Sequence, residues 1–178
     1  MGLLGDFKLW RKLKREELLL RSVAIGMNST IDWTKDQHVL MMDFDTKDLR
    51  RVEMSIEEAQ AFWNLGPGFL YETKNGFHCI MFFDLMPISR VRLILDYVDG
   101  VDPMFRYISR FYDRKTIRVA GKYQEKDINF LKIIKGFRHP QRFEYDLGYL
   151  KFKEHCMLRG DTVFLGEKDL IDRKFVRK

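Results

Sequence analysis

The stretch from His38 to Asp45 constrains this chain most, because it joins an uninterrupted apolar run to two acids. Val39 to Met42 contains no polar residue, which is typical of a strand that is covered on both faces. Asp43 and Asp45 follow two positions apart, and side chains two apart on a strand point to the same face. The pattern therefore predicts two carboxylates side by side at the end of a buried strand.

Two interpretations of this acid pair are open. Like charges at this spacing repel, so the pair needs a cation between the carboxylates or a proton on one of them. Hard divalent cations such as Mg²⁺ take oxygen ligands and keep positions open for phosphates. In the simpler alternative, the strand ends here and Asp43 and Asp45 are solvated loop residues.

Composition favours a globular protein of a reducing compartment. The 178 residues suit a single domain, and the net charge of +6 permits a nucleic-acid or nucleotide partner. Cys79 and Cys156 are too few for a four-cysteine zinc site, and without a secretory signal we expect free thiols. No apolar run approaches membrane-spanning length. We therefore expect a cytoplasmic protein with no membrane partner and no zinc.

The N-terminal part is predicted to contain one helix and one strand. Apolar residues among Lys, Arg and Glu indicate a basic amphipathic helix over residues 6–21. This helix either packs one stripe on the core or docks on a membrane or partner. A short strand is expected over residues 22–27, and a polar loop over residues 28–37.

The middle of the chain is predicted to form a helix and a hairpin. Ser55 and Glu58 have the spacing of a capping box, so a helix is expected to open there after a charged connection. The sequence Lys74-Asn75-Gly76 lies between apolar runs at 69–73 and 77–83. Asn-Gly between two such runs is a hairpin signal.

Further elements follow along the chain. A helix is expected over residues 89–98, and Asp102-Pro103 is typical of the start of the next helix. Residues 116–119 alternate polar and apolar, which predicts a strand. The type of the elements at 128–135 and 143–152 is left open. The alternation of strands and helices predicts an α+β or α/β domain.

The order of the polar landmarks resembles that of the archaeo-eukaryotic primase superfamily, especially the small primase-polymerases of archaeal plasmids and viruses. That family shows an acid-x-acid pair at a strand end, then a small-x-His motif on a strand, then a third acid. Here these positions are Asp43-Phe44-Asp45, Gly76-Phe77-His78 and Asp102. The segments 102–109 and 116–122 also look like that group. The resemblance covers roughly residues 38 to 125.

The resemblance implies a fold and an activity. The fold would be a single α+β domain over 1–178 with a primase-type, RRM-like core at about 22–125, built as an antiparallel or mixed sheet flanked by helices. The activity would be nucleotidyl transfer, in which a primer is made or extended on a DNA template with two Mg²⁺ or Mn²⁺ ions. Its partners would be single-stranded DNA or primer-template, an NTP or dNTP, and a helicase or other replication protein.

The resemblance also assigns roles to residues. The metal-binding and catalytic acids would be Asp43, Asp45 and Asp102. The residues that contact the incoming nucleotide would be His78, Arg118 and Lys122.

Alternatives to these roles are open. The acids that compete with Asp102 for the third position are Asp96, Asp99 and Asp113. His78 can instead be a strand histidine bonded to backbone, and the two bases can be solvated. Lys74 and Arg90 are weaker candidates for the triphosphate. Tyr112 or Tyr123 can stack on a base, although a core or surface role is the simpler interpretation.

Two other functions are compatible with the landmarks. The first is a catalytically inactive nucleic-acid-binding replication subunit of the same fold. The retained acid pair argues against it, because two crowded acids have no purpose without a cation. The second is a rolling-circle replication endonuclease, which needs two neighbouring histidines and a nucleophilic tyrosine. The sequence Phe77-His78-Cys79 supplies one histidine only.

Overall fold

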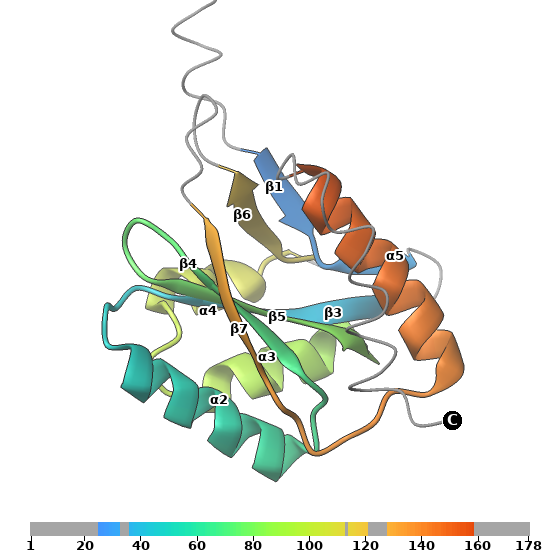
Figure 1. The fold of residues 1–178 in the computed structure, drawn as a ribbon, viewed down its shortest axis with the longest axis horizontal. Coiled ribbons are helices and arrows are strands. Elements are labelled where there is room, and N and C mark those ends of the chain that lie inside the picture. The colour runs from blue at the N-terminus through green and yellow to red at the C-terminus, as the bar shows by residue number, and fades with distance from the viewer. Residues whose placement is uncertain (1–24, 33–35, 113, 121–127, 159–178) are drawn as a thin grey trace, which may run out of the picture.

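The computed structural model describes residues 25–32, 36–112, 114–120 and 128–158. In these ranges the chain forms four helices and two antiparallel sheets (Figure 1). In chain order the elements are β1 Ile25–Asn28, β2 Thr30–Asp32, β3 Gln37–Phe44, α2 Leu49–Trp63, β4 Gly68–Glu72, β5 Phe77–Met86, α3 Ile88–Tyr97, α4 Pro103–Ser109, β6 Thr116–Ala120, β7 Asn129–Ile134 and α5 Arg142–Leu158. The predicted α+β class is confirmed. The helix predicted over residues 6–21 lies outside the described residues.

The larger sheet has the strand order β2-β3-β5-β4-β7, and every neighbouring pair in it is antiparallel. The strands β3 and β4 are joined through α2 and flank β5, which follows β4 by a hairpin. The strands β1 and β6 pair in a separate two-stranded antiparallel sheet. This arrangement places the acid-bearing β3 inside the sheet.

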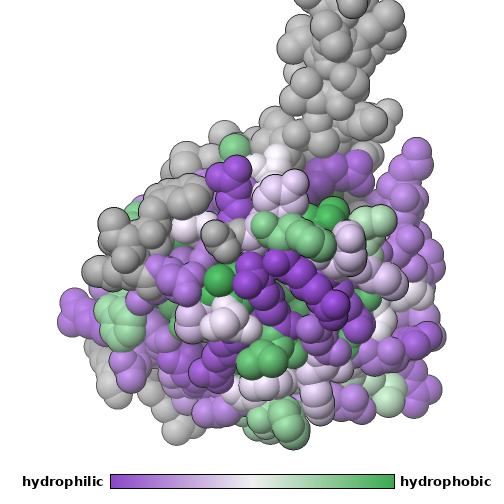
Figure 2. Space-filling model, turned by 180° about the vertical axis from the view of Figure 1, so that it is seen from behind, coloured by the Kyte–Doolittle hydropathy of each residue, from purple (hydrophilic) through white to green (hydrophobic). Residues whose placement is uncertain are grey.

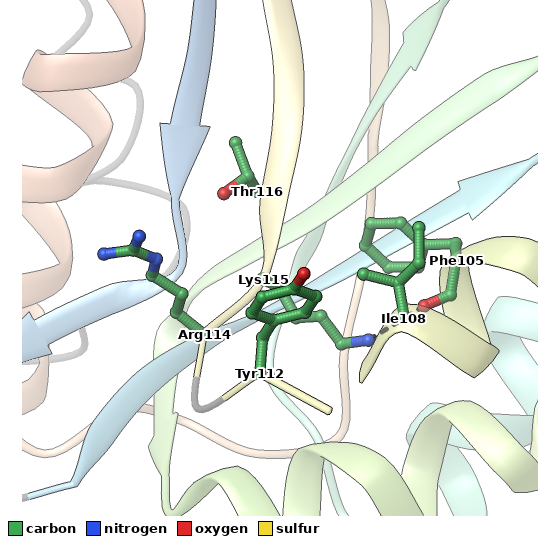
Figure 3. Close-up of a pocket in the computed structure, with 6 residues that line it drawn as sticks. All are labelled: Phe105, Ile108, Tyr112, Arg114, Lys115 and Thr116. Atoms are coloured by element: carbon green, nitrogen blue, oxygen red, sulfur yellow. Dashed lines mark hydrogen bonds between the residues drawn. The ribbon is translucent and has the colours of Figure 1, made fainter. Parts of the chain in front are cut away.

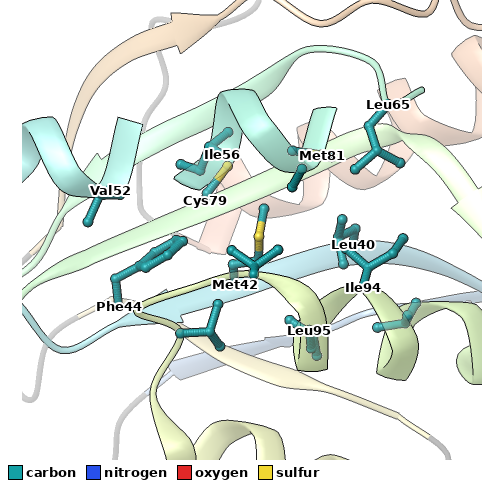
Figure 4. Close-up of a cluster of buried hydrophobic side chains, with 14 of the residues drawn as sticks. Leu40, Met42, Phe44, Val52, Ile56, Leu65, Cys79, Met81, Ile94 and Leu95 are labelled. Atoms are coloured by element: carbon teal, nitrogen blue, oxygen red, sulfur yellow. The ribbon is translucent and has the colours of Figure 1, made fainter. Parts of the chain in front are cut away.

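Both faces of β3 are buried, as its apolar sequence predicts. Leu40, Met42 and Phe44 belong to a hydrophobic cluster with residues of α2 and α3 (Figure 4). Val39 and Met41 belong to a second cluster with residues of β1, β6 and α5. Figure 1 shows α2 and α3 on one side of the sheet and α5 with β1 and β6 on the other. Alternation along the strand therefore supplies two core layers.

The start of α2 differs from the prediction. The helix begins at Leu49 rather than at Ser55, and Asp48 is its N-cap. Ser55 is buried inside the helix and Glu58 is exposed, so the predicted capping box is wrong. The charged residues assigned to a connection belong to the first helical turns. The longer helix is favoured because the buried Val52 extends the apolar stripe by one turn.

Other expectations are confirmed or settled. The hairpin of β4 and β5, the helix α3, the Asp102-capped α4 and the strand β6 lie close to their predicted bounds. The open segments at 128–135 and 143–152 form the strand β7 and the helix α5. The loop predicted over residues 28–37 contains the strand β2, because Thr30 pairs with His38 at the edge of the sheet.

A buried ionic cluster joins three segments far apart in the sequence. The Asp84 carboxylate, which is 1% exposed, accepts two hydrogen bonds from the Gly66 N–H at 3.0 and 2.9 Å and one from Arg138 at 3.0 Å. Arg138 also pairs with Glu144. Burial raises the pKa of Asp84 to about 6. The cluster thus fastens the end of α2 and the start of α5 to β5.

The surface carries hydrophobic residues between hydrophilic ones, as the view from behind shows (Figure 2). The helix α4 exposes three large hydrophobic side chains, Met104, Tyr107 and Ile108. Within the described ranges, no helix is both long and apolar enough to cross a membrane. Cys79 and Cys156 are both buried thiols.

Candidate active site at the end of β3

The acid strand and the histidine strand bring two predicted site residues together. Asp43 on β3 lies opposite His78 on β5 in the register of the sheet. The His78 Nε2 atom is 3.3 Å from the Asp43 Oδ1 atom. The His78 side chain is buried, whereas the Asp43 side chain is 33% exposed. The pair therefore has an interior histidine behind a carboxylate that solvent or a ligand can reach.

Gly76 holds the backbone around Asp45 close to the hairpin. A Cβ atom at Gly76 would lie 1.8 Å from the Phe44 carbonyl oxygen and 3.0 Å from the Thr46 backbone nitrogen. Gly76 does not have a positive φ angle. The small residue of the small-x-His motif is therefore needed for close backbone approach, not for an unusual turn conformation.

Asp102 joins the same end of β3 through its backbone. Its N–H donates to the Asp43 carbonyl oxygen at 2.7 Å. Its carboxylate caps α4, with Oδ1 accepting from the Met104 N–H at 3.0 Å and Oδ2 accepting from the Phe105 N–H at 3.2 Å. Asp102 therefore lies beside the acid strand while both of its carboxylate oxygens are engaged with α4.

The competitors for the third acidic position are placed elsewhere. Asp96 pairs with Arg110 at 3.5 Å, and Asp99 pairs with Arg51 at 2.8 Å, in exposed ion pairs. The hydrogen bond from Arg51 lowers the pKa of Asp99. Asp113 lies outside the described residues. Of the candidates that the structure describes, the acid that caps α4 is the one bonded to the backbone of the acid strand.

The fit of the site to a metal depends on how many donors the protein must supply. Among the described residues, no group of three His, Cys, Asp or Glu residues could hold a metal ion. Asp45 is exposed just beyond the end of β3. Mg²⁺ commonly binds through one or two carboxylates together with substrate phosphates and water. In type and number, Asp43 and Asp45 would supply that donor set, whereas the described residues form no all-protein cage.

The role of Arg118 and Lys122 in binding a nucleotide stays a prediction. Arg118 lies on β6 opposite Gly26, and its neighbours Ile117 and Val119 are buried in the core. Alternation therefore turns Arg118 to the other face of β6. Lys122 lies outside the described residues. The weaker candidate Arg90 donates to the Trp63 carbonyl oxygen at the end of α2 (3.2 Å), and Lys74 is exposed in the hairpin loop.

Comparisons with protein-family models, with curated proteins and with solved structures find no match to this chain. The resemblance to the primase superfamily stays a prediction that depends on the three motifs. The geometry of those motifs is compatible with it at Asp43, His78 and Gly76, which meet at one end of the sheet.

One cation beside this site was not singled out from the sequence. Lys47 follows Asp45 by two positions, and its Nζ donates to the Thr73 carbonyl oxygen at 2.7 Å. Its Nζ also lies 3.9 Å from Glu72. Lys47 thus fastens the loop after β3 to the hairpin that carries Gly76. A basic residue shortly after the acid pair was the only sequence signal for it.

Proposed function

We propose that this chain is a metal-dependent nucleotidyltransferase of the primase-polymerase kind, which makes or extends a primer on a DNA template. The observation that carries the proposal is the contact of Asp43 with His78, 3.3 Å apart, beside a backbone bond from Asp102. Three motifs that are far apart in sequence thus converge at one end of β3.

The topology supports the proposal. The order β3-α2-β4-β5-α3, with β5 between β3 and β4, is the split β-α-β arrangement of RRM-like and ferredoxin-like cores. The place next to β3, where the last strand of such a core would lie, is taken by β2. The net charge of +6 supports contacts with nucleic-acid phosphates.

The residues at the end of β3 would divide the work. Asp43 and Asp45 would hold a divalent cation, which when bound would keep the attacking and leaving oxygens in line and neutralise their charge. The contact of Asp43 with the His78 Nε2 atom holds the imidazole of His78 at the site. By the resemblance, His78 would contact a nucleotide phosphate, and Asp102 would keep α4 fixed beside the site. A helicase or other replication protein would be the partner.

A template-extension assay with labelled nucleotides and Mg²⁺ or Mn²⁺ tests the proposal. Wild type should extend a primer or make one, and Asp43→Asn should lower the rate at least about a hundred-fold, because a metal contributes several kcal/mol. Asp96→Asn is the matched control, since that exposed acid of α3 forms an ion pair with Arg110 rather than a contact with His78. Thermal melts should show that Asp43→Asn is folded and at least as stable as wild type.

The second candidate function is an inactive nucleic-acid-binding subunit of the same fold. It is favoured by one observation, namely that the described residues contain no three-donor metal group. The same assay separates the two functions. Wild-type protein that binds primer-template but extends nothing with either metal would refute the nucleotidyltransferase and leave the binding subunit.

A further inference from the structure

A pocket of about 370 Å³ lies between the end of α4 and the start of β6. The residues that line it are Phe105, Ile108, Tyr112, Arg114, Lys115 and Thr116. Figure 3 shows the Lys115 side chain extending towards Phe105 and Ile108 on α4, with Tyr112 beside it. Ligand pockets begin at about 300 Å³, so this pocket suits a small group such as one nucleotide unit.

Lys115 places a cation in this pocket, and among the described residues the carboxylate whose charge acts on it, Asp96, forms no ion pair with it. The residue is 2% exposed, and its Nζ donates to the Phe105 carbonyl oxygen at 2.9 Å. The same Nζ lies 4.7 Å from the centre of the Phe105 ring. In the described part of the chain, no carboxylate lies within 4.0 Å of it. Burial, followed by the charge of Arg92, lowers the pKa of Lys115 to about 8. A bound anion would relieve that cost.

A chain of hydrogen bonds positions Lys115. The Lys115 N–H donates to the Ser29 Oγ atom at 2.9 Å, and the Ser29 N–H donates to the Lys115 carbonyl oxygen at 2.7 Å. The Ser29 Oγ atom is 3.1 Å from the His38 Nδ1 atom, and the His38 Nε2 atom is 3.0 Å from the Asp36 Oδ1 atom. Ser29 is fully buried, so this chain supports the pocket rather than supplying a nucleophile.

Exposed rings lie next to the pocket. Tyr112 is 59% exposed, and Tyr107, Ile108 and Phe111 on or just after α4 are also exposed. The Tyr107 and Phe111 rings are 4.9 Å apart. A cation beside solvent-facing rings is the combination on which single-stranded nucleic acids bind, since phosphates pair with the cation and bases stack on the rings.

We propose that this pocket and the exposed rings of α4 seat a single strand of nucleic acid, with a phosphate at Lys115 and a base on Tyr112. The choice of a nucleic acid as ligand rests on the proposed function. The pocket is also joined to the acid site, because the Phe105 N–H bonds to the Asp102 carboxylate and the Phe105 carbonyl bonds to Lys115. A strand seated here would lie against α4, whose N-cap Asp102 bonds to the Asp43 backbone.

Binding of a fluorescein-labelled single-stranded DNA, measured by anisotropy at several salt concentrations, tests the inference. Tyr112→Ala should weaken binding about five-fold or more, because one base stack is lost. Lys115→Met should lower the slope of log affinity against log salt by about 0.7, the share of one phosphate contact. Tyr112→Ala substitutes an exposed side chain, so it tests the seat even if Lys115→Met fails to fold.

Matched controls come from exposed residues on other elements. Phe143→Ala at the start of α5 and Lys135→Met after β7 remove a ring and a charge at exposed positions outside the pocket. Both should bind the strand as wild type does. An unlabelled nucleoside triphosphate, used as a competitor, shows whether the pocket binds a free nucleotide or a nucleotide unit within a strand.

Several results would overturn the inference. One is wild-type affinity for the strand in Tyr112→Ala and in a folded Lys115→Met. Another is a mononucleotide that binds through Lys115 while strand affinity does not depend on it. A third is a concentration-dependent dimer that is lost in Tyr107→Ser, because a second copy would then cover α4. If wild type extends primers while Tyr112→Ala binds normally, the seat is wrong and the proposed function stands. If strand binding depends on Tyr112 but wild type extends no primer, the binding seat is correct and the proposed function is wrong.

Discussion

The buried Asp84 should make the stability of this protein depend on pH in a direction opposite to that of ordinary surface acids. Its carboxylate is 1% exposed, and burial outweighs the hydrogen bonds from Gly66 and Arg138 that favour the charged form. The pKa of Asp84 rises from 3.8 to about 6 in the folded state. That difference corresponds to about 3 kcal/mol of unfolding free energy.

The sign follows from the proton affinities. The folded chain binds the Asp84 proton more tightly than the unfolded chain does. The contribution of Asp84 is therefore fully present below pH 3.8 and is lost as the pH rises through about 6. Asp84→Asn is neutral at every pH. Hence the unfolding free energy of wild type minus that of Asp84→Asn should fall by about 2.4 kcal/mol between pH 4 and pH 7, because the unfolded carboxyl is already more than half ionised at pH 4.

Urea unfolding of wild type and Asp84→Asn at half-unit steps of pH measures this difference. The contributions of all other titratable groups are shared by the two proteins and cancel in the subtraction. Asp96→Asn serves as the control, because it removes an exposed acid of α3 that does not belong to the Asp84 cluster. A difference that rises with pH would refute the reasoning. It would mean that Arg138 and the Gly66 N–H lower the folded pKa of Asp84 below 3.8.

Two other perturbations test the local geometry. Gly76→Ala should cost about 1–3 kcal/mol of unfolding free energy, because its Cβ atom would lie 1.8 Å from the Phe44 carbonyl oxygen, and it should abolish primer extension. Asn75→Ala, at the exposed neighbouring position, should change neither the unfolding free energy in urea nor the extension rate. Asp48→Ala should cost about 1 kcal/mol in urea unfolding if α2 starts at Leu49, and an unchanged midpoint would contradict that start.

The sequence predicts this fold best where local pattern and tertiary contacts agree. The run from Val39 to Met42 predicts a strand buried on both faces, and the structure places it inside the sheet. The sequence separation of Asp43 and His78 does not predict that the two residues lie opposite each other. That follows from the antiparallel pairing of β3 with β5, which has a register shift after Val39. The shift depends on long-range packing, so no local pattern reveals it.

The site was predicted less completely than the fold, and for a physical reason. Gly76 is a turn residue by sequence, but its role is to admit the Phe44 backbone, which only the folded sheet brings near. Lys115 is one base among 32 Lys and Arg residues in the sequence, and it is held by Ser29 and Phe105, which lie in other segments of the chain. Asp48 and Ser55 are both good capping residues, and packing of the α2 stripe decides between them.

Asp102 allows its two roles to be separated. Its carboxylate caps α4, and its backbone bonds to Asp43, so it can act as a cap, as a metal ligand, or as both. Asparagine caps a helix about as well as aspartate but lacks the charge a divalent cation needs.

Asp102→Asn should therefore keep the unfolding free energy and the affinity for single strands, and primer extension should fall only if the charge of the Asp102 carboxylate also serves the cation. Asp102→Ala should in addition lose about 1 kcal/mol of stability and weaken strand binding, because α4 carries the rings beside Lys115. Urea unfolding, anisotropy and extension on the same preparations give the three readouts. If Asp102→Asn extends primers as wild type does, Asp102 is a cap alone, and any cation must be held by Asp43 and Asp45 with the phosphates of the nucleotide.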